Sequence, residues 1–472
     1  MNGGLGPGVS IIIVSCCVAL GFLLVSNPVA AVLVMLVVEF FRAATPTTGL
    51  PAEPFVIAFF GAIGSAVLAA FRRSRGMPQL GVVELAMGLY IAWNITSAIA
   101  PHEFPSADSL TGVAMPPWRL ILTGILVPFT MYIIGRWMFD RKSSVDGLLW
   151  IIVGLTGISV IVSILQILGL SVPFVPTYSN DPSTTWDSRA VGVFNQPVVN
   201  GLVMTIGFAA AIYLASQRGN AQWKRLIAYI VAASSVCGIY VTYTRIAWIT
   251  FGVALLMGVI LGRGMRRGFA VVLVGVAVVL AANWTISSSD GRAASRISSE
   301  SEIHDRLNGA ATSLWAIQER PLLGWGIGRF SQVNTYHHQQ WSQDINWVRG
   351  YGYTSHENEL GIAAELGLIG LALWLTILTL VVRRLITAYR AARHPGNAAD
   401  PGLALVAVIA MTTWCATGVT NSMTFYDFAN GITFLLVGVV VGQHERSRHV
   451  SRIEPGPTTG ETPDETRFVG VR

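Results

Sequence analysis

Arg245 is a charged residue placed where one long apolar stretch ends and another begins, within residues 243–248. An arginine at the centre of a bilayer costs roughly 2.5–3.5 kcal/mol on insertion scales, and less near the surface. A residue that carries such a cost often serves a transport pathway or binds an anionic ligand. Alternatively, the side chain only extends to the lipid headgroups. The residues alone leave both interpretations open.

A histidine and a glutamate precede another apolar run, in residues 354–359. Ser355 is the expected N-cap, which would place His356 and Glu357 in the first turn of a helix. Free N–H groups and the helix dipole attract anions there and favour a neutral imidazole, usable as a base or a hydrogen-bond partner. The two residues could equally just cap the helix. A zinc site of the H-E-x-x-H type is not expected, because Leu360 stands at the second histidine position.

Further polar residues lie beside apolar blocks. Arg189 could bind phosphate or extend to the headgroups, and Asn195 and Asn200 could orient a sugar or cap a helix. Asp427 is an acid in a short loop, where a solvated charge is the plain alternative. The glycines of Pro321–Gly328 suggest a nucleotide loop, but there is no P-loop lysine. A tight turn that packs this loop against the membrane part is favoured.

Composition determines which elements can position these residues. The 472-residue chain is 53% hydrophobic and only 12% charged, whereas soluble proteins are about 25% charged. Its apolar residues form blocks near the 20 residues that a membrane-spanning helix needs. The net charge of +6 resides in loops between blocks, so no nucleic-acid partner is expected. The four cysteines show no spacing typical of disulfide or zinc sites.

The sequence therefore predicts an all-α polytopic membrane protein in the lipid bilayer. The apolar blocks are 10–26, 28–41, 54–71, 79–100, 118–139, 147–170, 197–216, 223–243, 246–262, 268–286, 359–382, 401–420 and 431–441. Every second loop is basic, which assigns those loops to the cytoplasm and the others to the outside. The first two blocks give either one broken span or two spans, so about 12 helices are expected, with 13 as the alternative.

Four parts of the chain follow from this pattern. Residues 1–286 form an N-terminal transmembrane bundle, 287–358 one large extracytoplasmic loop, 359–443 the C-terminal helices and 444–472 a disordered cytoplasmic tail. In the loop, Glu302–Arg320 is expected to be helical, with Pro321 ending it. Several aromatic residues follow and could rest on the outer headgroups.

Together these residues resemble the O-antigen ligase and O-antigen polymerase family. Three segments carry the resemblance: Arg189–Asn200; Thr244-Arg245 with Trp248; and the run containing Arg306, Trp315, Pro321–Gly328, His356 and Glu365–Gly370. It covers about residues 189–370, while the first six blocks match only in hydropathy.

The resemblance implies a membrane glycosyltransferase similar to the GT-C class. It would move a glycan from a polyprenyl diphosphate carrier to a hydroxyl of a glycan, lipid or protein acceptor, at the outer face of the bacterial inner membrane. It implies no cofactor, no metal and no nucleotide sugar. Two or three arginines could clamp the diphosphate, each charge-assisted bond contributing roughly 1.5–3 kcal/mol. The acceptor would then invert the anomeric carbon.

The resemblance also assigns residues. The functional residues implied are Arg245, Arg306 and His356, with Arg320 as an alternative to Arg306. Arg189 and Asp427 are carried over as substrate-binding residues, and Asn195, Arg320 and Glu357 are further candidates for substrate binding. Glu357 departs from the family pattern, where small or polar residues are common, and leaves open whether it assists His356 in moving a proton.

Other functions remain open at this stage. A polymerase would use the same donor but add it to another lipid-linked glycan. A transporter or flippase of polyprenyl-linked sugars would also carry charges at span ends, but the sequence shows no repeated pair of broken helices. Its polar residues gather at one face, which favours an enzyme. A scaffolding protein would not need arginines outside the basic loops.

Overall fold

The computed structural model describes residues 26–44, 53–72, 80–107, 114–170, 189–287, 300–348, 350–394 and 399–453. In this part of the chain the regular elements are helices. In chain order, the first seven described α-helices are α2 (Pro28–Phe40), α3 (Pro54–Arg72), α4 (Val82–Ile99), α5 (Pro117–Leu120), α6 (Val127–Met138), α7 (Lys142–Ile167) and α8 (Pro197–Ser216). The others are α9 (Gln222–Tyr240), α10 (Arg245–Leu261), α11 (Arg266–Ser287), α13 (Glu300–Glu319), α14 (Phe330–His337), α15 (Asn358–Ala392), α16 (Pro401–Gly418) and α17 (Asp427–Ile453).

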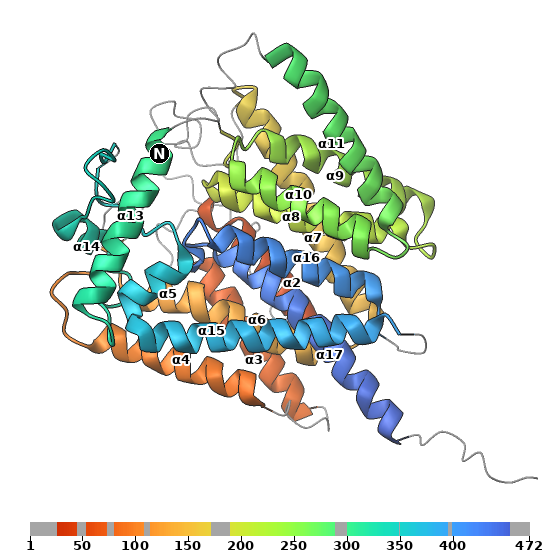
Figure 1. Ribbon diagram of the computed structural model, residues 1–472. Coiled ribbons are helices and arrows are strands. Elements are labelled where there is room, and N and C mark those ends of the chain that lie inside the picture. Colours follow the sequence, from red (N-terminus) through yellow and green to blue (C-terminus); the bar gives the residue numbers. More distant parts are fainter. Residues whose placement is uncertain are drawn as a thin grey trace, which may run out of the picture.

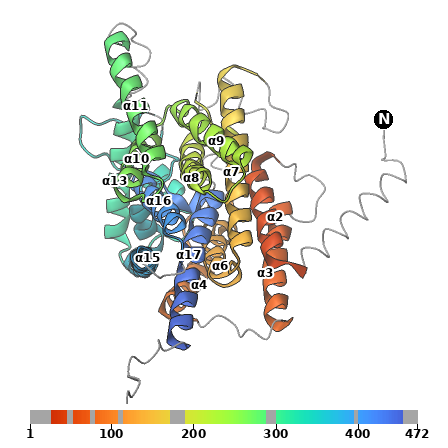
Figure 2. The ribbon, with the colours of Figure 1, turned by 90° about the vertical axis from the view of Figure 1, so that its right-hand side faces the viewer.

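The long apolar helices form one bundle around α8, whose residues from Pro197 to Ala215 are all buried. Helices α7, α9, α10 and α16 contact α8, and α2 and α3 pack together on one flank (Figures 1 and 2). Helices α13 and α14 lie together at one end of the bundle (Figure 1). We call this end the α13 end.

Helices α6 and α17 are packed closely through glycines. A Cβ atom at Gly438 would lie 2.2 Å from the Tyr132 carbonyl oxygen, and one at Gly442 would lie 2.1 Å from that of Arg136. Small residues let helix backbones approach in this way within membranes. The contact fixes α17, and with it the connection that precedes α17 at the α13 end.

Seven described helices are long and apolar enough to cross a membrane: α3, α4, the continuous Pro117–Met138 segment, α7, α8, α15 and α16. Helices α2 and α10 are apolar but shorter. The protein is therefore a multi-pass membrane protein. The expected total of 12 or 13 spans stays a prediction, and the block at residues 10–26 lies almost entirely outside the described residues.

The glycine-rich segment Pro321–Gly328 packs against a break in α15. Gly367 has a φ of 69° inside this helix. The amides of Trp325 and Gly326 donate to the carbonyls of Ala364 and Glu365 at 2.9 and 2.7 Å. The Glu365 carboxylate also accepts from two amides of the loop, at Gly328 (2.9 Å) and Phe330 (3.0 Å). The predicted tight turn is confirmed, and it fixes α13 and α14 on the bundle.

At the opposite end, charged side chains join the four helices α4, α6, α15 and α17. Arg136 of α6 pairs with Glu84 at 2.6 Å and with Glu445 at 2.5 Å. Arg384 of α15 reaches the same two carboxylates. Glu445 belongs to α17, which continues to Ile453. Residues 444–453, predicted to begin a disordered tail, are therefore helical, and residues 454–472 lie outside the described residues.

Candidate functional site

Arg245 is the first residue of α10, at the α13 end, after the N-cap Thr244. Its side chain is partly buried, and its Nη2 atom is buried without a hydrogen-bond partner among the described residues. A buried donor that makes no hydrogen bond costs roughly 1–3 kcal/mol, and more when charged. Nearby, Trp248 is fixed: its ring stacks on Tyr240 at 5.7 Å between centroids. The Arg245 guanidinium therefore has unused capacity to bind an anion.

The segment that carries Arg189 lies beside the start of α10. The Ala190 amide donates to the carbonyl of Val241 at 3.0 Å. Arg189 itself pairs with Glu302 of α13 at 2.6 Å. This pair connects the bundle to the N-terminal part of α13, four residues before Arg306. The structure thereby brings the segments of Arg189, Arg245 and Arg306 to one end of the molecule.

Arg306 lies on α13 and acts electrostatically on the start of α15. Burial raises the pKa of the Glu357 carboxyl, the neighbouring charge of Glu359 raises it further, and the positive charge of Arg306 lowers it. Arg306 likewise opposes the rise that burial causes in the pKa of Tyr426. Arg306, Glu357 and Tyr426 therefore share one electrostatic environment beside the connection from α16 to α17.

His356 precedes α15 instead of lying in its first turn. The N-cap is Glu357, and α15 begins at Asn358, so the prediction that Ser355 caps the helix is wrong. The Ser355 hydroxyl donates to the Glu357 carbonyl at 2.8 Å, and His356 has a φ of 57°, which a helix does not accommodate. The imidazole is half-buried and stacks near the Tyr353 ring, with the centroids 6.2 Å apart.

Backbone strain gathers in these same segments. The described non-glycine residues with positive φ are Asn195 (53°), Tyr243 (46°) and His356 (57°). Asn195 lies in the segment that follows Arg189, Tyr243 lies two residues before Arg245, and His356 lies two residues before α15. A residue held in the left-handed region costs of order 1–3 kcal/mol and is typical of functional sites. Sequence analysis did not predict these conformations.

Two of the predicted residues, Asn200 and Arg320, make contacts within the protein that serve the fold. Asn200 is fully buried; it accepts from Ser159, at 2.5 Å, and donates to Ser163 and Ala190, so it fixes the 189–195 segment and leaves no group for a sugar. Arg320 pairs with Glu103 at 2.9 Å. At 1.5 Å per residue it lies roughly 21 Å along α13 from Arg306. The structure brings Arg306, and not Arg320, to the start of α15.

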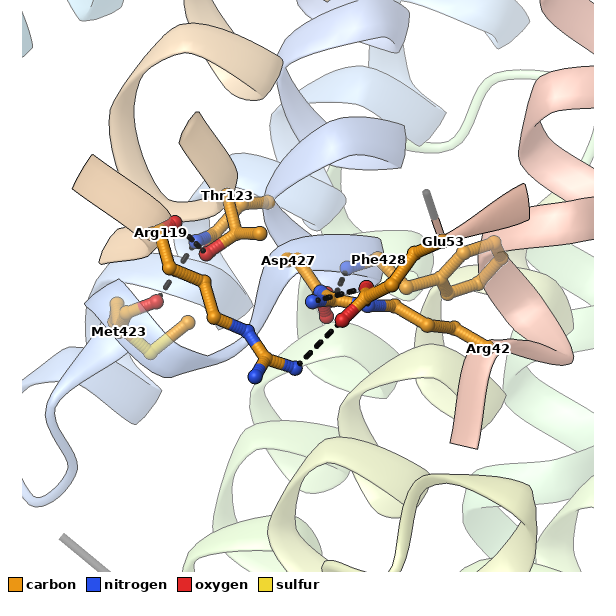
Figure 3. Close-up of polar contacts among 8 residues, drawn as sticks. Arg42, Glu53, Arg119, Thr123, Met423, Asp427 and Phe428 are labelled. Carbon is orange, nitrogen blue, oxygen red and sulfur yellow. Dashed lines mark hydrogen bonds and ion pairs between the residues drawn. The ribbon is translucent and has the colours of Figure 1, made fainter. Parts of the chain in front are cut away.

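Asp427 opens α17 and pairs with Arg42, a residue that sequence analysis missed (Figure 3). Arg42 also binds Glu53, which in turn binds Arg119 at 3.1 Å. Arg42 lies in a loop between the basic ones, and Arg119 lies at the start of the apolar block 118–139, next to another such loop. This departure from the charge pattern was the signal that could have identified them.

A pocket lies next to these residues, beneath Ser355 and Asn358 and between α4, α6, α15 and the connection before α17. The Asn94 Oδ1 and Trp374 Nε1 atoms in its lining are buried and have no hydrogen-bond partner in the described part of the chain. Further lining residues are aromatic: Tyr90, Phe330, Trp414, Phe425 and Phe434. A hydroxyl group can donate to the amide oxygen and accept from the indole, so the pocket suits a sugar hydroxyl or water.

One part of the chain is similar to a known protein family. Residues 228–375 match the family model described as O-antigen ligase. This range includes Arg245, Arg306, the glycine-rich segment and His356. The likeness covers less than half of the chain, and we call residues 228–375 the O-antigen ligase segment because of it. The resemblance seen in the sequence is confirmed. A comparison with curated proteins finds no match.

Proposed function

We propose that this protein, which carries an O-antigen ligase segment within a multi-pass membrane bundle, moves a glycan from a polyprenyl diphosphate to an acceptor hydroxyl. The observation that carries the proposal is the buried Nη2 of Arg245, which has no partner among the described residues. A diphosphate leaving group supplies the oxyanion that this nitrogen lacks. The α13 end would be the outer face of the bacterial inner membrane, because the arginine-rich loops follow helices that end at the other side.

The arginines would stabilise the charge that develops on the leaving diphosphate. Charge-assisted hydrogen bonds contribute roughly 1.5–3 kcal/mol each, and groups fixed before the reaction cost no reorganisation during it. Arg245 would bind the diphosphate directly and Arg306 from the α13 side. Arg189, held by Glu302, would position the segment that contains Asn195. Asp427 would act by fixing Arg42 at the α13 end.

His356 would serve the acceptor or the diphosphate. As a base it would take the proton of the acceptor hydroxyl while that oxygen attacks the anomeric carbon opposite the leaving group, which inverts the configuration. A positioned base typically contributes 10²–10⁴-fold. As a ligand it would donate a hydrogen bond to a diphosphate oxygen. The pocket beneath Ser355 would take a hydroxyl group of the acceptor.

The profile of lipid-linked glycans in cells that lack the protein tests this function. Mass spectrometry of polyprenyl-diphosphate-linked glycans should show accumulation of long chains, which a blocked ligase leaves on the carrier. Accumulated single repeat units would instead identify a polymerase with the same donor. An unchanged profile, with restored expression as the control, would contradict glycan transfer from this lipid and favour a transporter.

The pH dependence of transfer tests Glu357. Because its pKa is raised, its carboxylate is lost at a higher pH than that of an ordinary glutamate, and any step that needs the carboxylate should slow as the pH falls through that value. We expect Glu357→Gln to remove this acid limb from the plot of kcat/KM against pH. Glu359→Gln should move the limb to lower pH, since it removes a charge that raises the pKa. An identical limb in Glu357→Gln and wild type would exclude the role.

A further inference from the structure

A second group of charges lies at the α13 end, built from elements outside the O-antigen ligase segment (Figure 3). Arg42 belongs to the short 3-10 turn Arg42–Ala44 after α2, and Arg119 to α5. Glu53, just before α3, joins them. Its Oε2 accepts from Arg42 Nε and Nη2, both at 2.9 Å, and its Oε1 lies 3.1 Å from Arg119 Nη2.

The two acids of this group are held differently. Asp427 begins α17, accepts from the Phe428 amide at 3.0 Å and pairs with Arg42, so it belongs to the helix terminus. Among the described residues, the partners of the Glu53 carboxylate are the two guanidinium groups. Each of its oxygens faces a different arginine, which is the way two guanidinium groups hold one phosphoryl group.

The group is accessible from the side of Arg119. The side chains of Arg119, Glu53 and Arg42 are 45%, 26% and 19% exposed. Arg119 is the exposed partner, and ion pairs of exposed side chains contribute little to stability, so a stronger anion can compete with the carboxylate from this side. Once Glu53 leaves, Asp427 still pairs with Arg42, but Arg119 loses the acid that it pairs with, and the positive charge of Arg119 favours binding of an anion.

The position of Arg42 links this group to the candidate site. The turn at Arg42 contacts the 3-10 turn Gly192–Phe194. The ring of Phe40 lies 5.2 Å from that of Phe194, and Phe194 stacks on Phe428 with centroids 5.5 Å apart. Arg42 therefore adjoins the segment of Arg189 and Asn195 while lying on a different helix connection.

We propose that Arg42 and Arg119 form a second phosphoryl-binding site, and that Glu53 is the carboxylate that occupies it when no ligand is bound. The ligand is a phosphoryl group carried by a lipid, either a polyprenyl diphosphate or an acidic headgroup. The existence of the site is independent of glycan transfer. Only its assignment to the lipid-linked donor rests on the proposed function.

Titration of the purified full-length protein with inorganic pyrophosphate tests the site. The protein is held in phosphatidylcholine nanodiscs, and every variant also carries Arg245→Ala, which removes the arginine of the proposed catalytic site. Because Glu53→Gln removes the competing charge, we expect it to bind pyrophosphate about tenfold more tightly by calorimetry. Arg119→Ala should bind about tenfold more weakly. Glu103→Gln, which breaks the separate pair with Arg320, is the matched control and should change nothing.

If Glu53→Gln lowers the melting temperature and leaves pyrophosphate affinity as it is in Glu103→Gln, the four charges are a structural brace and the proposal is overturned. Transfer is measured separately in the Arg245→Ala single variant. Retained transfer there, together with the expected change in pyrophosphate affinity, would contradict the proposed function alone. Lost transfer, with no affinity change in Glu53→Gln, would contradict the second site alone.

Competition identifies the lipid. Pyrophosphate bound to the Glu53→Gln variant is challenged with nanodiscs that contain phosphatidylglycerol or, separately, a polyprenyl diphosphate. Displacement by both supports a headgroup site, and displacement by the polyprenyl diphosphate alone supports a donor site. Displacement by neither would overturn the assignment to a lipid.

Discussion

Replacing Arg245 with alanine should lower the kcat/KM of glycan transfer by about 10²–10³-fold, the range found when one preorganised donor to a developing oxyanion is removed. The guanidinium already has a buried nitrogen without a partner among the described residues, so its loss removes a binding group for the leaving diphosphate and not a structural pair. The melting temperature should not fall. Transfer is measured by the release of polyprenyl diphosphate from extracted lipid-linked glycan.

Arg218→Ala is the matched control. Arg218 is exposed in the turn between α8 and α9, at the end opposite α13, and should tolerate the change. Arg245→Lys should recover only part of the activity, because an ammonium group cannot make the bidentate contact of a guanidinium. Equal activity in Arg245→Ala and Arg218→Ala, at equal membrane levels, would remove Arg245 from the site.

Replacing His356 with alanine should reduce transfer by about 10²–10⁴-fold if the imidazole is the base, and unused glycan should accumulate on the lipid. His356→Asn separates the two proposed roles. Asparagine tolerates the left-handed conformation that His356 adopts and can donate a hydrogen bond, but it cannot accept a proton as a base does. A base therefore predicts that both variants are equally inactive, whereas a diphosphate ligand predicts that His356→Asn keeps substantial activity.

His304→Ala provides the control for this pair, since His304 lies on the same helix as Arg306 and outside the proposed machinery. Its lipid profile should match that of wild type. If His356→Ala also gives the wild-type profile, His356 has no part in the reaction, and the strain at its backbone needs another explanation.

Hydropathy determined where most helices lie, because a bilayer sets the length and polarity of each span. The predicted block at 197–216 coincides with α8, and the predicted helix 302–320 differs from α13 by only one or two residues at each end. The same local information placed Arg245 at the start of a helix. Polar residues at helix ends can be recognised from the sequence, because the apolar blocks on either side show where the helices end.

Contacts between distant segments were decided by the tertiary structure. Arg42 and Asp427 are 385 residues apart and still form a pair, which no local pattern indicates. Ser355 has the residue type of an N-cap, but its hydroxyl donates to the Glu357 carbonyl and α15 begins later. The proposed roles of Arg306 and Arg320 could be separated only by packing, because the docking of Pro321–Gly328 on Gly367 fixes which part of α13 faces α15. Sequence specifies local conformation and burial, whereas the pairing of charges depends on which helices pack side by side.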